Sequence, residues 1–224
     1  MWHLTPSLDI LILASTVAPA ELIRVMTSFG LGQANRLRLG QAAQGGVLVA
    51  YVGVTALALI ALRPSRSALG IPQSPRGAAL YAAAIGVGVL AFGAEYLLGS
   101  MPVLAMGRQP QLRVSLAGNS ATIPYLISIL LVAVVEEVLY RGIWLDLLRG
   151  SLHVGTAYAV LACAAGYASG HLFFGGMALA QKFVSGAGFS LLMVATGSLA
   201  APIAAHVSLN VIVFALARVQ RTPI

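Results

Sequence analysis

Long apolar blocks, separated by short polar stretches, dominate the pattern along this chain of 224 residues. A helix needs about 20 predominantly apolar residues to cross a bilayer. Seven blocks come near that length, at 7–29, 45–62, 78–98, 122–139, 156–174, 178–196 and 199–217. The pattern predicts an all-α fold, a polytopic helical membrane bundle of about seven transmembrane helices, within a range of roughly six to eight.

The chain shows no internal repeat, low-complexity tract or soluble appendage, so residues 1–224 are predicted to form a single integral membrane domain. The first block is the exception to the clean pattern, because Glu21 and Arg24 fall inside it. They are three residues apart, so either they pair on one helix face or the helix ends early. No basic region precedes this block, which favours a retained helix over a cleaved signal peptide.

Composition supports a membrane location and excludes a nucleic-acid partner. The chain is 59% hydrophobic and only 8% charged, whereas soluble domains are about a quarter charged. The net charge of +7 comes mostly from arginines between the apolar blocks, where they anchor loops at lipid headgroups. The lipid bilayer is therefore an expected partner. The preference for arginine over lysine indicates a GC-rich bacterial genome, and the expected location is a bacterial cytoplasmic membrane.

Ionisable groups inside the predicted spans are the informative positions. Each costs about 2.5–3.5 kcal/mol at the centre of a span on insertion scales, so such groups usually face the bundle interior and serve a function. The positions that stand out are the adjacent pair Glu136 and Glu137, together with Arg141, His171 and His206.

The helix carrying the two glutamates has a polar stripe. At about 100° per residue, Glu136 stacks one turn from Tyr140, and Glu137 one turn from Arg141. Two adjacent carboxylates in a low dielectric do not both ionise readily without a nearby cation. We expect Arg141 to compensate Glu137, which leaves Glu136 for chemistry. A purely structural Glu–Arg pair is the alternative, although it leaves Glu136 unexplained.

Two histidines are placed to meet this stripe. Glu136 and His171 each lie about 20 Å along their helices from the intervening turn, at 1.5 Å per residue. His206 is on the last predicted span, with Asn210 one turn later on the same face. All of these side chains can therefore reach one site.

Three motifs occur in order: E-E-x-x-x-R at 136–141, an aromatic-x-x-x-H ending at His171, and H-x-x-x-N from His206 to Asn210. Together they resemble the CAAX protease and bacteriocin-processing (CPBP, or Abi) family over residues 123–213. Tyr167 stands where that family usually has phenylalanine. The resemblance implies an intramembrane endopeptidase of the glutamic type, acting on a membrane-associated protein or peptide such as a lipidated or hydrophobic C-terminal tail or a bacterial peptide.

The resemblance also implies roles for individual residues. Glu136 would be the general base that activates water, and His171 would orient or share that proton. His206 and Asn210 would bind the oxyanion of the tetrahedral intermediate. Glu137, Arg141 and Tyr140 would shape the site and balance its charge.

No cofactor is expected for such a reaction, and a metal-dependent mechanism is the minority interpretation. The H-E-x-x-H motif is absent, and Arg141 would oppose a dication. The ligands of a metal ion would be Glu136, Glu137, His171 and His206.

Two functions of other classes remain open from the sequence. Intramembrane glutamates and histidines also build the proton pathways of transporters, and a membrane scaffold could bind a peptide without cutting it. Serine and aspartyl intramembrane proteases fit poorly, since G-x-S-x-G is absent and neither Asp9 nor Asp146 lies in the middle of a span.

Overall fold

The computed structural model describes residues 6–17, 39–62, 77–112 and 122–220, and all regular structure in these ranges is helical. The predicted all-α class is confirmed. The α-helices are α1 (Pro6–Ser15), α3 (Leu39–Leu62), α4 (Gly77–Ala105), α5 (Ile123–Glu137), α6 (Thr156–Ser169), α7 (Gly176–Thr196) and α8 (Ala200–Val219). Two π-helical segments, Val138–Trp144 and Leu147–Ser151, continue α5, and a 3₁₀ turn, Leu172–Phe174, follows α6.

Four helical segments in the described part of the chain are long and apolar enough to cross a bilayer: α4, α5 with its continuation to Ser151, α7 and α8. Shorter apolar helices occupy Leu48–Ala58, within α3, and Thr156–Ser169. These segments form the predicted helical membrane bundle. Residues 18–29 of the first predicted span, including Glu21 and Arg24, lie outside the described residues.

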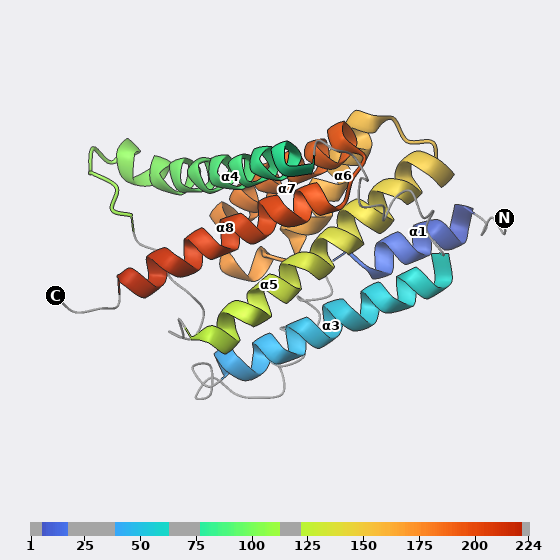
Figure 1. Cartoon of the computed structure of the whole chain (residues 1–224), viewed down its shortest axis with the longest axis horizontal. Coiled ribbons are helices and arrows are strands. Elements are labelled where there is room, and N and C mark those ends of the chain that lie inside the picture. The colour runs from blue at the N-terminus through green and yellow to red at the C-terminus, as the bar shows by residue number, and fades with distance from the viewer. Residues whose placement is uncertain (1–5, 18–38, 63–76, 113–121, 221–224) are drawn as a thin grey trace.

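The helices form two layers. In Figure 1, α4, α8, α5 and α3 lie side by side in that order, and each packs against the next. Helix α7 lies behind them, where it packs against α4, α6 and α8. Helices α5 and α8 run antiparallel, because His206 contacts Glu137 while the later Asn210 contacts the earlier Ile129.

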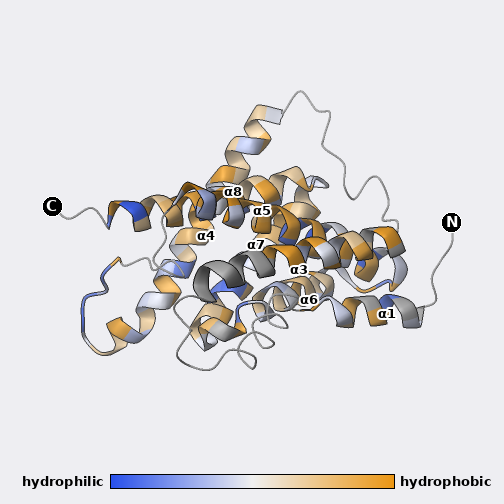
Figure 2. Ribbon diagram, turned by 90° about the horizontal axis from the view of Figure 1, so that it is seen from below, coloured by the Kyte–Doolittle hydropathy of each residue, from blue (hydrophilic) through white to orange (hydrophobic). Residues whose placement is uncertain are grey.

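Polarity in this bundle is opposite to that of a soluble protein. Large apolar side chains lie exposed on the outer faces, for example Val49 at 71% and Leu90 at 73% of full exposure, and Figure 2 shows apolar residues predominating along the helices. Glu137 and Arg141, by contrast, are completely buried. Lipid stabilises the exposed apolar faces, whereas a charge is stable only inside the bundle.

The helix that carries the glutamates extends further than the sequence pattern indicated. The predicted span stopped at Leu139, but the helical path continues through π-helical turns to Ser151. Seven consecutive residues, Leu139–Leu145, are buried, so protein surrounds this segment on every side. π-Helical turns are rare and occur frequently at functional sites.

Helix α6 is shorter than predicted. The pattern extended the fifth span to Phe174, but α6 ends at Ser169, before Gly170, and His171 lies in the turn that follows. This turn is held by its own backbone, since His171 N–H donates to the Ala168 carbonyl and Phe174 N–H to the His171 carbonyl. The side chains of the 3₁₀ turn Leu172–Phe174 are also apolar, so the hydropathy pattern did not show where the helix ends.

A close helix approach fixes α8 against α4. A Cβ atom added to Gly88 would collide with the Ala205 carbonyl and the Ser208 hydroxyl of α8. Ser208 itself donates to the Ile85 carbonyl across the same contact. The lack of a side chain at Gly88 therefore sets the position of α8, and with it the position of His206.

We predict that Gly88→Ala destabilises the protein by about 1–3 kcal/mol, the usual cost of overpacking a well-packed contact. Thermal unfolding in detergent measures this loss. Gly86→Ala on the same helix is the control, because nothing lies within 4 Å of its added Cβ and alanine is the better helix former by about 1 kcal/mol. Equal melting temperatures for the two variants would contradict the close approach.

Candidate active site

A buried guanidinium joins two helices at the centre of the bundle. Arg141 NH1 lies 3.0 Å from Glu137 Oε1, its NH2 donates to the Gly186 carbonyl at 2.7 Å, and its Nε donates to Ser190 Oγ at 3.2 Å. A Cβ on Gly186 would lie 3.3 Å from Arg141 NH2 and 2.8 Å from the Tyr167 ring. Glycine at 186 thus makes room for the guanidinium, whose planar fork binds partners in several directions.

Glu137 connects this guanidinium to α8. The same Oε1 atom that contacts Arg141 accepts a hydrogen bond from His206 Nδ1 at 2.8 Å. With a proton on Nδ1, the Nε2 atom of the neutral imidazole is an acceptor, and the Tyr167 hydroxyl lies 3.2 Å from it. Glu137 therefore sets both the orientation and the tautomer of His206.

Glu136 has a different environment from its neighbour. Its nearest charged partner is His206, with Nε2 at 3.9 Å from Oε2, beyond hydrogen-bonding distance. The Glu136 side chain is 6% exposed, whereas that of Glu137 is completely buried. Glu136 is thus also buried, but it has no ion pair within hydrogen-bonding distance and keeps acceptor capacity.

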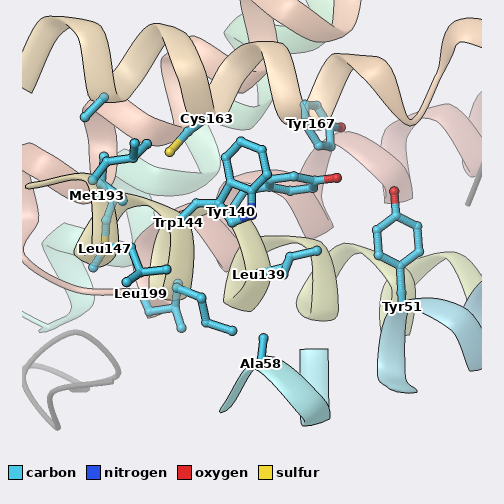
Figure 3. Packing of buried hydrophobic residues seen from close by; sticks show 14 residues of the cluster. Tyr51, Ala58, Leu139, Tyr140, Trp144, Leu147, Cys163, Tyr167, Met193 and Leu199 are labelled. Atoms are coloured by element: carbon cyan, nitrogen blue, oxygen red, sulfur yellow. The ribbon is translucent and has the colours of Figure 1, made fainter. Parts of the chain in front are cut away.

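Aromatic rings enclose these charged groups. The Tyr167 ring centroid lies 4.9 Å from the Arg141 guanidinium carbon and 5.5 Å from the His206 ring, and Phe189 stacks on the other face of the cluster at 5.1 Å from His206. Tyr140 packs edge-on against Tyr167 at 6.0 Å. Figure 3 shows Tyr140, Trp144 and Tyr167 within the buried hydrophobic cluster. Such a wall limits water and strengthens electrostatic interactions within it.

The structure holds Tyr140 and its neighbour Trp144 against the end of α1. The Tyr140 hydroxyl donates to the Val17 carbonyl at 3.0 Å, and Trp144 Nε1 donates to Thr16 Oγ1 at 2.8 Å. Ser169 of α6 also donates to the Val17 carbonyl. The segment that follows α1 therefore closes one side of the predicted site.

The two remaining predicted site residues lie around the Glu–His–Arg cluster. His171 packs its ring against Tyr167 at 5.3 Å, and its Nδ1 atom is 3.3 Å from the Tyr167 carbonyl. Asn210 donates from Nδ2 to the Ile129 carbonyl at 3.2 Å. The structure thus groups Glu136, Glu137, Arg141 and His206, connects His171 to them through Tyr167, and directs the Asn210 amide to the backbone of α5.

Sequence reasoning missed three side chains near the cluster. Lys182 on α7 forms an ion pair with Glu95 on α4 at 2.8 Å, and its charge acts on Glu136. Both residues lie inside predicted spans, so the criterion that selected the other ionisable positions would have found them. Tyr51 on α3 lies beside Glu136, and no pattern in the sequence identifies it.

The donor set does not fit a metal ion. No three histidine, cysteine, aspartate or glutamate side chains in the described ranges are grouped so as to hold one. Glu137 Oε1 already contacts both Arg141 and His206, so a dication there would face a buried guanidinium. The four ligands considered from the sequence do not converge on one point.

By fold and site, the chain is an integral membrane protein with a buried Glu–His–Arg centre. Residues 118–212 match the family described as "Type II CAAX prenyl endopeptidase Rce1-like". This match confirms the resemblance to the CPBP family over that segment. No curated protein and no solved structure matches the chain.

We predict that Arg141→Lys destabilises the protein by about 1–3 kcal/mol, the usual cost of leaving a buried hydrogen-bonding group without its partner. Lysine has a single charged nitrogen and cannot contact Glu137, Gly186 and Ser190 together as arginine does. Thermal unfolding in detergent provides the measurement. The control is Arg149→Lys at an exposed position on the same helical segment, which should melt with the wild type. A similar loss in both variants would refute the special role of Arg141.

Proposed function

We propose that this protein is an intramembrane endopeptidase in which Glu136 activates the water that hydrolyses the substrate's peptide bond. The observation that carries the proposal is the contrast between the two adjacent glutamates. Arg141 and His206 both contact Glu137, whereas Glu136 has no ion pair within hydrogen-bonding distance and faces His206 and Tyr51. A carboxylate with free acceptor capacity is what a general base requires. The match of the surrounding segment to an endopeptidase family supports the same reaction.

The reaction follows ordinary acyl-transfer chemistry. Glu136 takes one proton from water as the water oxygen bonds to the scissile carbonyl carbon, and the π electrons of the carbonyl move onto its oxygen. Collapse of this intermediate breaks the C–N bond, and the proton held by Glu136 passes to the leaving amine. A carboxylic acid and an amine result, and Glu136 is ionised again.

His206 is the second group that the geometry favours. Glu137 holds its ring so that Nε2 faces Glu136 and the Tyr167 hydroxyl. We assign His206 to the oxyanion of the intermediate, in the form that carries a proton on both ring nitrogens before water attacks and after the products leave, so that Nε2 donates a hydrogen bond and transfers no proton. The roles of Asn210 in oxyanion binding and of His171 in orienting the base stay predictions. Oxyanion binding by Asn210 requires its amide to break the hydrogen bond to the Ile129 carbonyl.

We further propose that the substrate is a membrane-associated protein or peptide whose lipidated or hydrophobic tail enters from the bilayer. The family is named for prenyl endopeptidases, and the outer faces of the helices are apolar. A bacterial cytoplasmic membrane stays the predicted location, which membrane fractionation tests.

We predict that Glu136→Gln abolishes cleavage and leaves the melting temperature near that of the wild type, because the amide keeps the shape of the carboxylate but cannot accept a proton. The assay uses both proteins in detergent with a library of membrane-anchored peptides, read by mass spectrometry with and without a strong chelator. Chelator should not change the rate. Asp146→Asn, the same chemical change further along this helical segment, should keep the wild-type rate. Cleavage by Glu136→Gln at the wild-type rate would refute the assignment.

We also predict that removing the lipid or apolar anchor from a cleaved peptide lowers kcat/KM by at least about tenfold, because a 1.4 kcal/mol loss of binding corresponds to a factor of ten. The matched pair shares the sequence around the scissile bond and differs only in the anchor. Equal kcat/KM values for the two peptides would show that the substrate does not enter from the membrane.

A further inference from the structure

Tyr51 carries a hydroxyl group that is buried without a partner. This tyrosine lies on α3, is 1% exposed, and its hydroxyl forms no hydrogen bond with any described residue. A buried polar group left unsatisfied costs about 1–3 kcal/mol. Phenylalanine would fill the same space without this cost. The presence of the hydroxyl at this position therefore indicates a functional role.

The groups that surround the Tyr51 hydroxyl indicate what this role is. The Tyr51 hydroxyl faces Glu136 and Tyr140, close enough to act on both electrostatically and as a long hydrogen-bond partner, and in Figure 3 the Tyr140 hydroxyl points toward it. On another side it touches the end of α6, where a Cβ added to Gly170 would lie 2.7 Å from the Tyr51 oxygen. The unpartnered donor therefore stands between the proposed base and the turn that carries His171.

The other donors at the site already have partners. The Asn210 amide is bonded to the Ile129 carbonyl, the Tyr167 hydroxyl lies at His206 Nε2, and the Tyr140 hydroxyl donates to the Val17 carbonyl. Among these groups, only the Tyr51 hydroxyl forms no hydrogen bond of ordinary length, and it faces Glu136 and Tyr140. Preorganised donors of this kind are what an oxyanion requires.

We propose that Tyr51 is a catalytic residue whose hydroxyl donates a hydrogen bond to the substrate's carbonyl oxygen as it becomes the oxyanion. The inference rests on the proposed endopeptidase function. The tyrosine keeps its proton throughout, so the balance of the hydrolysis does not change. Tyr51 lies outside the segment that matches the family, residues 118–212. A helix outside the matched segment would thus complete the active site.

We predict that Tyr51→Phe lowers kcat by about 10²–10³-fold, the loss typical of removing one oxyanion donor, with little change in KM. The variant should also be at least as stable as the wild type in a thermal melt, because it removes an unsatisfied buried hydroxyl. A purely structural tyrosine would show the reverse, with lower stability and intact turnover. A phosphinic peptide that imitates the tetrahedral intermediate should lose affinity by a factor similar to the loss in kcat.

Two further variants separate the hydroxyl from the packing of α3. Thr55→Val removes another buried, unpartnered hydroxyl one turn along the same helix, and it should keep the wild-type kcat. Gly170→Ala retains the tyrosine but displaces its hydroxyl, and it should lower kcat by at least about tenfold, equivalent to 1.4 kcal/mol. Wild-type kcat in Tyr51→Phe, or an equal loss in Thr55→Val, would overturn the inference. Because Glu136→Gln is assayed in parallel, failure of this inference is distinguishable from failure of the protease assignment.

Discussion

The arrangement of the bundle depends on one buried charge, the guanidinium of Arg141. A cation enclosed by apolar helices is stable only if several partners surround it, and here they come from its own helical segment and from α7. Glu137 extends the network to His206 on α8. Helices that lipid alone would leave free to slide are therefore fixed relative to one another by a single set of polar contacts.

This network also gives the two adjacent glutamates, Glu136 and Glu137, different roles. Glu137 is enclosed and contacts a cation and a histidine, so its energetic role is to keep Arg141 and His206 in place. Glu136, one residue earlier, faces the slightly exposed side of the same helix. Adjacent helical positions differ by about 100° in direction. The doubled glutamate thus supplies a structural carboxylate and a chemically available one at almost the same depth.

The parts of this arrangement that the sequence predicted are local or depend on the bilayer. Long apolar blocks must be helical in lipid because every backbone group needs a partner, and Glu137 and Arg141 face each other because they are four residues apart. The missed parts are long-range. The hydrogen bond between Glu137 and His206 spans 69 positions, and the π-helical turns after Glu137 leave no mark in the hydropathy pattern. Tyr51 looks like any other aromatic residue on an apolar helix.

Unsatisfied groups show where this bundle departs from the most stable packing. The orphaned buried atoms within the described residues include the Tyr51 hydroxyl and Glu137 Oε2, and both lie at the Glu–His cluster. Glu137 keeps its unpaired oxygen because its other oxygen holds Arg141 and His206 in place, whereas phenylalanine could replace Tyr51 without this cost. Unpaired polar atoms beside Glu136 form a site whose hydrogen bonds are completed only by something that enters it, and a hydrated peptide bond offers the missing acceptor and donor together.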